Sequence, residues 1–346
     1  MKLYTDQNLY FFWILFVSKI YLYSIVIGTL YHKTENSLIV RKTKKMKTPP
    51  FLKPGDKIRI VSPAGKVKEK FVLPAVKWFE KQGYRVELGE HVFASHLQFA
   101  GTDRQRLEDL QTALDDPEAA AIVCSRGGYG TVRIISKLNY SKLMEHPKWI
   151  VGFSDISILH ACLNNHEMAT IHGAMPRYFF DKEGTPNENL QSLMQLLTGK
   201  GASYSIPAAQ GDRQGRTTGE LIGGNLSIIS SMQGTRCELN TAGKILFLED
   251  IDEFLYHTDR MMHQLKLSGK LKNLAGLILG SFTDMKDNES PFGKTIHEII
   301  AEAVEEFSFP VCYDFPAGHD GKNLALAFGK KWELDVTKTH STLSLI

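Results

Sequence analysis

The sequence predicts an α/β protein with a doubly wound domain followed by a second compact unit. Between Lys57 and Leu197, short β-branched apolar runs alternate with stretches of helical period. A stretch rich in Gly, Ser, Ala and charge at 198–216 separates this part from further strands and helices. Alternating strands and helices are typical of a parallel sheet with helices on its faces, and active groups then lie at the carboxyl ends of the strands.

Four short apolar runs are expected as buried strands of the first domain, because each is bounded by Gly, Pro or Ser. They are Lys57–Val61, Arg85–Leu88, Ala120–Cys124 and Trp149–Phe153. Apolar residues recur on one helical face in Phe71–Gln82 and Thr102–Asp115. The second unit shows strands near Lys244–Leu248, Ala275–Leu279 and Pro310–Asp314, and helices at Tyr256–Ser268 and Thr295–Glu306. The predicted boundaries are an extension at 1–45, an α/β domain at 46–197, a linker at 198–216 and a second domain at 217–346.

Charge and cysteine placement exclude several classes of protein. Of the 346 residues 43% are hydrophobic, and the net charge is +3, but residues 1–45 hold seven basic and only two acidic side chains. The remainder is slightly acidic, so we expect no nucleic-acid partner. The four cysteines, Cys124, Cys162, Cys237 and Cys312, are far apart and form no close pair of the kind that binds zinc. We expect them to be buried and reduced.

The N-terminal segment contains an apolar run, Leu9–Leu30, that is long enough to span a bilayer. Lys19 interrupts this run, and a central lysine costs about 2.5–3.5 kcal/mol on insertion scales. Only Lys2 precedes it, and no small-x-small cleavage pattern follows. Residues 1–45 are therefore interpreted as a misassigned extension before a true start at Met46, or as a membrane anchor. In both cases we expect the body in the cytoplasm, with membrane contact only through an anchor.

The segment VGFSDISILH places Ser154 between an apolar run and an amphipathic helix. A serine at such a turn lies at a helix N-terminus, where free N–H groups stabilise an oxyanion. The usual pattern is G-x-S-x-G, whereas here Asp155 follows the serine and no glycine stands at the second position. Taken alone, the pattern is more typical of a Ser or Asp N-cap.

The segment CSRGGYGTVR also follows a predicted strand and opens a helix. Its adjacent Gly127 and Gly128 let backbone amides approach a ligand closely, so the loop is a candidate oxyanion hole or carboxylate site. The phosphate-loop pattern is absent. The same sequence is also typical of an ordinary strand-to-helix turn with no ligand.

Two further segments carry titratable side chains. KILFLEDIDE runs from a strand into Glu249 and three more acidic residues. These carboxylates are candidate acid–base groups or metal ligands, or they belong to a solvated loop. DFPAGHDGKN places His319 in a Gly-flanked loop, where an imidazole reaches across a cleft or is merely exposed. HEMATIH is similar to a zinc-peptidase helix, but Thr170 stands where the second histidine is needed, so we expect no metal.

Together and in this order, these segments resemble the LD-carboxypeptidase family, which comprises muramoyl-tetrapeptide carboxypeptidases and the related microcin-immunity peptidases. The resemblance covers Phe51 to Val336. It rests on SPAG, FAGTDRQRLEDL, SRGGYGTVR, VGFSD, GGNL, FLEDIDE and AGH. It implies a flavodoxin-like N-terminal domain, a smaller β-rich C-terminal domain, often a homodimer, and no cofactor.

The resemblance also implies roles for individual residues. Ser154 corresponds to the nucleophile, His319 to the base and Glu249 to the third triad member. Backbone amides of Asp155 and Gly128 correspond to the oxyanion hole. Substrate contacts are expected at Gly127 and at Asn225 of GGNL, although a turn residue explains Asn225 equally well.

The implied activity is acyl transfer that removes the terminal D-alanine from a murein tetrapeptide, in peptidoglycan recycling. One alternative is a microcin-immunity-type serine peptidase acting on peptidyl- or aminoacyl-nucleotides, which would need an aromatic-lined pocket for a base. A second alternative is a non-catalytic muropeptide-binding protein, against which the intact Ser, Glu and His argue. A nucleotide-binding domain would rest on fold analogy alone.

Overall fold

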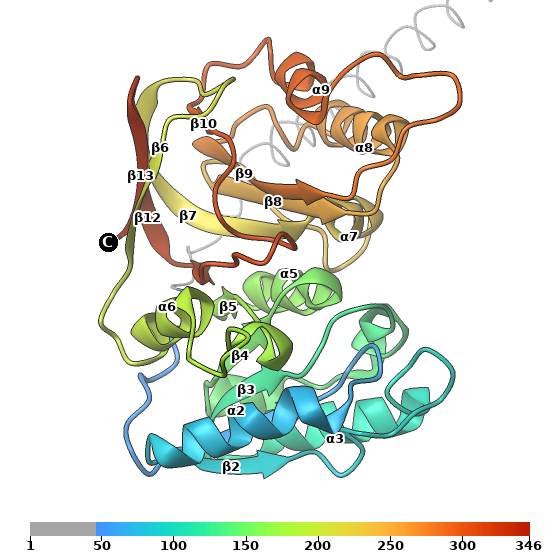
Figure 1. Cartoon of the computed structure of the whole chain (residues 1–346), viewed down its shortest axis with the longest axis vertical. Helices are drawn as coiled ribbons and strands as arrows, with labels where there is room; N and C mark the ends of the chain where they lie inside the picture. The colour runs from blue at the N-terminus through green and yellow to red at the C-terminus, as the bar shows by residue number, and fades with distance from the viewer. Residues whose placement is uncertain (1–45) are drawn as a thin grey trace, which may run out of the picture. The chain divides into compact units, whose positions relative to one another are not determined.

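The computed structural model describes residues 46–346, which form one compact unit with two sheets (Figure 1). The predicted extension at 1–45, with the apolar run Leu9–Leu30, lies outside the described residues. Within the described part of the chain, no helix is long and apolar enough to cross a bilayer.

The first sheet has six strands in the order β11-β5-β4-β3-β1-β2. Its strands are β1 (Lys57–Val61), β2 (Arg85–Leu88), β3 (Ala119–Cys124), β4 (Trp149–Gly152), β5 (Thr170–His172) and β11 (Leu326–Phe328). β1 to β5 are mutually parallel, whereas β11 pairs antiparallel with β5. The predicted α/β class with a parallel sheet is confirmed, and all four strands predicted for this domain form.

The helices of this half are α2 (Glu69–Lys81), α3 (Asp103–Asp115), α4 (Ser141–Glu145), α5 (Ser157–Asn165) and α6 (Glu188–Leu197). α2 buries Val72, Ala75 and Phe79, as its period predicts. α3 begins after Thr102, whose hydroxyl accepts a hydrogen bond from the backbone of Gln105 in a capping box. α5 packs against strand β7 of the second sheet, so it joins the two halves of the unit.

The second sheet has seven strands in the order β10-β9-β8-β7-β12-β13-β6. They are β6 (Ser203–Pro207), β7 (Gly215–Asn225), β8 (Ile245–Ile251), β9 (Gly276–Thr283), β10 (Val311–Cys312), β12 (Lys331–Val336) and β13 (His340–Leu345). β7 to β10 are parallel neighbours, and the other pairings are antiparallel. Helices α7 (Leu226–Ser231), α8 (Leu255–Leu267) and α9 (Ile296–Ala303) belong to this half, in which α8 and α9 lie side by side.

The predicted linker at 198–216 contains strand β6. Its Ser- and Gly-rich composition favours a loop, but Ser203–Pro207 pairs antiparallel with β13 along the edge of the second sheet. Exposed and partly buried residues alternate along β6, which is the pattern of an edge strand with one partly covered face.

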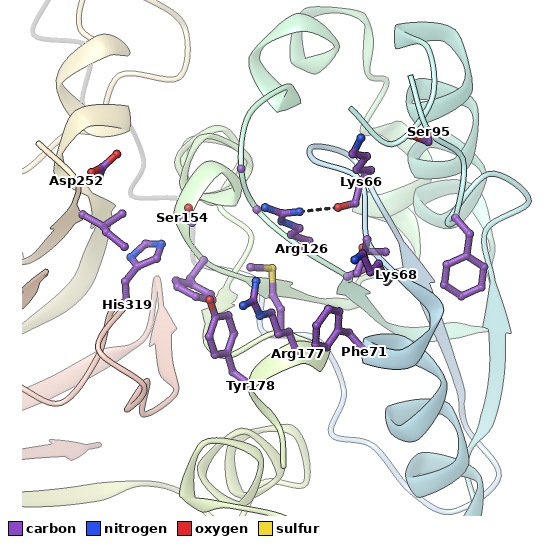
Figure 2. A pocket seen from close by; sticks show the side chains of 18 residues that line it. Lys66, Lys68, Phe71, Ser95, Arg126, Ser154, Arg177, Tyr178, Asp252 and His319 are labelled. Carbon is purple, nitrogen blue, oxygen red and sulfur yellow. Dashed lines mark hydrogen bonds between the residues drawn. The ribbon is translucent and has the colours of Figure 1, made fainter. Parts of the chain in front are cut away.

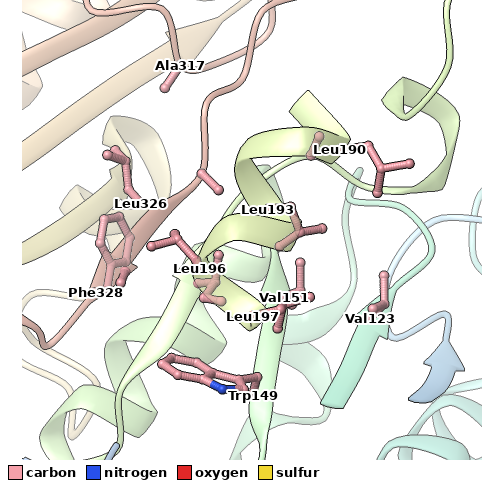
Figure 3. Close-up of a cluster of buried hydrophobic side chains, with 14 of the residues drawn as sticks. Val123, Trp149, Val151, Leu190, Leu193, Leu196, Leu197, Ala317, Leu326 and Phe328 are labelled. Atoms are coloured by element: carbon pink, nitrogen blue, oxygen red, sulfur yellow. The ribbon is translucent and has the colours of Figure 1, made fainter. Parts of the chain in front are cut away.

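One hydrophobic core extends from the first sheet to the C-terminal segment (Figure 3). Trp149 and Val151 of β4 belong to the same cluster as Leu193 of α6 and Phe328 of β11. Because β11 comes from the C-terminal part of the chain yet pairs with β5, the two halves share buried surface. This shared core fixes the loop before β11 relative to β4.

Two of the cysteines correct the expectation that all four are reduced. Cys162 of α5 and Cys237 form a disulfide with a Cα–Cα distance of 4.4 Å, although 75 positions separate them in the sequence. Cys124 and Cys312 are free and buried, as expected. The spacing of cysteines in the sequence did not reveal the pair because the fold, not a local motif, brings them together.

Candidate active site

Ser154 follows β4 and opens the turn that leads into α5. Its φ is 63°, in the left-handed region that side-chain-bearing residues rarely adopt. Strained residues of this kind concentrate at functional sites, and a strained strand-to-helix turn is how hydrolases present a nucleophilic serine. The backbone therefore gives Ser154 a geometry that an ordinary N-cap does not need.

The GGYG loop lies directly against Ser154. A Cβ atom at Gly127 would lie 2.8 Å from the Ser154 Cβ and 3.0 Å from its Oγ, so only glycine fits. The Gly127 carbonyl accepts a hydrogen bond from the Gly65 N–H at 3.0 Å, which links the loop to the SPAG segment. Gly128, with φ of 102°, lines the same cavity as the serine.

The Asp155 side chain ties the serine turn to the same loop. Its Oδ2 accepts a hydrogen bond from the Thr131 N–H at 2.9 Å. Burial raises the pKa of Asp155, and the hydrogen bonds from the Thr131 side chain and backbone partly offset this. The side chain therefore holds the turn, while its backbone N–H remains the predicted oxyanion donor.

His319 forms a partly buried pair with Glu249. The Nδ1 atom of His319 lies 2.7 Å from Oε2 of Glu249, whose side chain is fully buried in β8. Burial alone would lower the pKa of His319, but the hydrogen bond and negative charge of Glu249 outweigh it, so the pKa is raised above 6.5. With Nδ1–H donating to the carboxylate, Nε2 is left to accept a proton.

Three further side chains position the His319 loop. The His319 N–H donates to Ser281 Oγ at 2.9 Å, and the Gly318 N–H donates to Asn323 Oδ1 at 3.2 Å. His172 Nε2 lies 3.2 Å from the same Asn323 oxygen. Because that atom is an acceptor, His172 must be the Nε2–H tautomer, and burial keeps it neutral by lowering its pKa well below 6.5. Sequence reasoning missed Ser281, Asn323 and His172.

A cavity of about 840 Å³ brings these groups together (Figure 2). It is lined by Ser154 and His319 from different halves of the unit and by Gly127 and Gly128. The Phe153 ring packs against the His319 ring with centroids 4.8 Å apart. In the structure of residues 46–346, Ser154 and His319 are not joined by a hydrogen bond. Such contacts often tighten only when substrate binds.

Asn225 lies outside this cavity. It is 6% exposed, and its Oδ1 accepts a hydrogen bond from the Ile228 N–H as the N-cap of α7. Its Nδ2 donates to Asp250 Oδ1 at 2.8 Å. Burial, followed by the charge of Glu249, raises the pKa of Asp250 to about 7. Asn225 therefore caps α7 from a buried position beside Asp250, near the end of β8.

The segment HEMATIH, which is similar to a zinc-peptidase helix in sequence, does not form a helix that carries two histidines. His166 stands at the C-cap of α5, and its Nδ1 lies 2.8 Å from the Cys162 carbonyl oxygen. His172 belongs to β5. The two imidazoles therefore lie on different elements.

Comparison with known families matches both halves of the chain. Residues 58–173 match the LD-carboxypeptidase N-terminal domain, and residues 218–334 match the LD-carboxypeptidase C-terminal domain. A murein tetrapeptide carboxypeptidase of Pseudomonas aeruginosa is 33% identical over 283 residues, which cover 79% of this chain and 91% of the relative. Fold and comparison together define a peptidase with two sheets. The chain belongs to the LD-carboxypeptidase family.

Solved structures show the same fold. The crystal structure of a muramoyltetrapeptide carboxypeptidase from Oxalobacter formigenes matches with a TM-score of 0.76 at 28% identity, covering 84% of this chain and 98% of that one. A microcin C7 self immunity protein in complex with aspartyl sulfamoyl adenosine matches with a TM-score of 0.74 at 20% identity, covering 86% of this chain and 98% of that one. The second likeness shows the fold alone.

Proposed function

We propose that this chain is a serine-type LD-carboxypeptidase that releases the terminal D-alanine of murein tetrapeptides. The observation that carries the proposal is the His319–Glu249 pair, whose imidazole lines the same cavity as the strained Ser154. The relatives in Pseudomonas aeruginosa and Oxalobacter formigenes are named for this substrate class.

Ser154 acts as the nucleophile in the first half of the reaction. His319 Nε2 takes the hydroxyl proton while Ser154 Oγ bonds to the scissile carbonyl carbon. Glu249 holds the Nδ1–H tautomer and stabilises the imidazolium. The Gly128 and Asp155 N–H groups stabilise the oxyanion, and His319 then donates its proton to the leaving nitrogen as the C–N bond breaks.

Water completes the reaction. His319 takes a proton from a water molecule, whose oxygen bonds to the acyl carbon. The bond from that carbon to Ser154 Oγ breaks, and His319 returns the proton to the serine. The products are free D-alanine and a tripeptide with a new carboxylate, so the enzyme is regenerated without a cofactor.

The distribution of the lining residues supports removal of one small residue. Figure 2 shows His319 and Asp252 on one side of Ser154, while Lys66, Lys68 and Phe71 lie on the other. The leaving group lies beside the general acid His319, where Asp252 and its neighbour Ile251 also line the cavity. The longer acyl part then extends toward the side of Lys66, Lys68 and Phe71.

The test is quantification of free D-alanine after incubation with a murein tetrapeptide. Wild type should release it, and Ser154→Ala should lose activity by several orders of magnitude, because triad members act as a unit. Ser136→Ala, an exposed serine outside the cavity, is the matched control. Near-normal turnover by Ser154→Ala would reject the mechanism.

One observation favours the microcin-immunity-type alternative. Aromatic side chains of Phe71, Phe93 and Tyr178 line the cavity, as a pocket for a nucleobase requires. Under this alternative, an aminoacyl sulfamoyl adenosine would inhibit D-alanine release at micromolar concentration. Absence of inhibition at millimolar concentration would reject this alternative and leave the murein tetrapeptide as the proposed substrate.

The proposal includes a compartment and an oligomeric state. Action on tetrapeptides in peptidoglycan recycling implies the cytoplasm, and the family resemblance implies a homodimer. The Cys162–Cys237 disulfide weighs against the cytoplasm, because thiols there stay reduced. Cell fractionation tests the compartment, and sedimentation velocity of the purified chain tests the dimer.

A further inference from the structure

Arg106 of α3 is a fully buried arginine that does not line the cavity of Ser154. Its Nη1 donates hydrogen bonds to the Pro63 carbonyl oxygen at 2.7 Å and to the Gly130 carbonyl oxygen at 2.8 Å. Its Nη2 binds the carboxylate of Asp103 at the start of the same helix. A buried charge is costly unless it is paired and hydrogen-bonded, and here one guanidinium joins three segments of the chain.

The peptide group between Gly130 and Thr131 is held on both of its sides. Its carbonyl oxygen accepts the hydrogen bond from Arg106, and its N–H donates to Asp155 Oδ2 at 2.9 Å. The C=O and N–H of a trans peptide lie in one plane and point in opposite directions, so two opposed partners fix the orientation of the whole group. Arg106 therefore holds this peptide group against the turn that carries the serine.

The GGYG loop depends on such support because its backbone is permissive. Gly128 and Gly130 have φ of 102° and 142°, which glycine adopts without steric cost. A Cβ atom at Gly130 would lie 2.5 Å from Arg106 Nη1, so a side chain there would displace the guanidinium. At the other end of the loop, the Gly127 carbonyl accepts the Gly65 N–H. Gly128, whose N–H is the proposed oxyanion donor, lies between these two attachments.

The fork shape of the guanidinium suits this position. One planar group reaches two carbonyl oxygens and a carboxylate at once, whereas the ammonium of a lysine presents no such fork. The Asp103 carboxylate also accepts a hydrogen bond from Arg133 Nε at 2.9 Å, and Arg133 ends the short 3-10 helix that follows the loop. The loop is thus attached to the start of α3 through Gly130 and again through Arg133.

We propose that Arg106 is a positioning residue that holds the Gly128 N–H where it stabilises the oxyanion. The inference rests on the proposed function. Arg106 acts through the Gly130 carbonyl and does not itself contact the substrate. Because a preorganised donor contributes most when charge develops on the scissile carbonyl oxygen, loss of Arg106 should lower kcat and leave substrate binding nearly unchanged.

The experiment measures D-alanine release from a murein tetrapeptide by wild type and by Arg106→Gln. We expect kcat to fall by about 10- to 100-fold, because the variant displaces an oxyanion donor without deleting it. KM should stay within about twofold of the wild-type value. Arg106→Lys keeps the charge but loses the fork, so its kcat should lie between the other two.

A transition-state analogue separates donor positioning from a general loss of order. In a peptide boronate, boron replaces the scissile carbonyl carbon and bonds to Ser154 Oγ, which gives a negatively charged tetrahedral adduct with an oxygen in the oxyanion site. The tripeptide product binds without forming an adduct. Arg106→Gln should weaken boronate inhibition by the same factor as kcat/KM and leave the Kd of the tripeptide unchanged.

The matched control is Arg104→Gln, because Arg104 is an exposed arginine of the same helix that pairs with Glu108. It should leave kcat and boronate inhibition unchanged. Asp103→Asn loosens the hold on Arg106 without truncating a buried side chain, and should lower kcat by about 3- to 10-fold at constant KM. A thermal melt followed by circular dichroism shows whether each variant is folded, and Asp103→Asn decides the outcome if Arg106→Gln is not.

The positioning role would be overturned by a folded Arg106→Gln with wild-type kcat, or by an equal loss of affinity for the boronate and for the tripeptide. Wild-type kcat in Asp103→Asn, where Arg106→Gln does not fold, would overturn it too. Each of these results leaves the proposed function intact. Failure of the wild type to release D-alanine would overturn both.

Discussion

At the scale of single residues, the pKa of His319 links structure to rate. In the proposed mechanism the imidazole must be neutral to accept the Ser154 proton, and Glu249 raises its pKa above 6.5 despite burial. The acidic limb of the kcat/KM profile should therefore lie above pH 6.5, with activity lost as the pH falls through it. Glu249→Gln removes the charge, so the limb should move to lower pH while the plateau drops by orders of magnitude. An unmoved limb in Glu249→Gln would assign the titration to another group.

Asn323 should act through the His319 loop and not through substrate. Its Oδ1 accepts hydrogen bonds from the Gly318 N–H and from His172 Nε2. Asn323→Ala releases both, so we expect kcat to fall by about 10- to 100-fold with little change in KM, because a small misplacement of the base is costly. A rise in KM at constant kcat would instead mean that Asn323 contacts the substrate.

The candidate triad could be found from short sequence patterns, whereas its supports could not. The local sequence identifies each member of the candidate triad. Ser154 and Glu249 follow apolar runs, and His319 lies between glycines. Asn323 stands four positions after His319, yet its role depends on His172, which is 151 positions away. Arg126 and Arg177 look like ordinary surface arginines until the fold places them in one cavity.

At the scale of elements, the ends of β7 and β8 meet the start of α7. Asn225 caps α7 and donates to Asp250, which also accepts the Ser227 N–H at 3.0 Å. Asn225→Ala removes the cap and leaves a buried carboxylate short of a donor. We expect the free energy of unfolding to fall by about 1–3 kcal/mol, measured by urea titration.

The control for this prediction is Asn288→Ala, in an exposed loop, which should change stability little. If Asn225→Ala were as stable as wild type and only KM rose, the side chain would be a substrate contact, as the family resemblance implies.

Elements with strong local patterns were predictable. β1 and β2 have the predicted boundaries, and α2 and α8 lie within two residues of theirs. β6 and β11 were missed because each is short and depends on a distant partner, β13 for one and β5 for the other. Composition favours a linker at 198–216, but it does not show that an edge strand forms there.

At the scale of the whole molecule, the Cys162–Cys237 disulfide joins α5, which follows the serine turn, to the second half. Unfolded without reductant, the purified protein should show two reactive thiols, those of Cys124 and Cys312. Cys162→Ser should lower the melting temperature, because a crosslink closing a long loop is worth about 2–5 kcal/mol. Four reactive thiols in the protein as isolated would contradict the crosslink.

The two halves also share a core, which the domain pattern in the sequence did not show. β11 enters the first sheet from the C-terminal part of the chain, and Phe328 packs with residues of β4 and α6. The His319 loop lies just before this strand, so the proposed base is anchored to the half that carries Ser154. This arrangement explains how groups from distant segments face one cavity.

The central claim is that Ser154 is a nucleophile activated by His319. A fluorophosphonate probe followed by peptide mass spectrometry tests it directly, since the probe bonds covalently only to an activated serine. We predict one adduct, on the peptide that contains Ser154, and its loss in His319→Ala. An adduct on a different serine, or labelling of Ser154 that is unchanged in His319→Ala, would contradict the account.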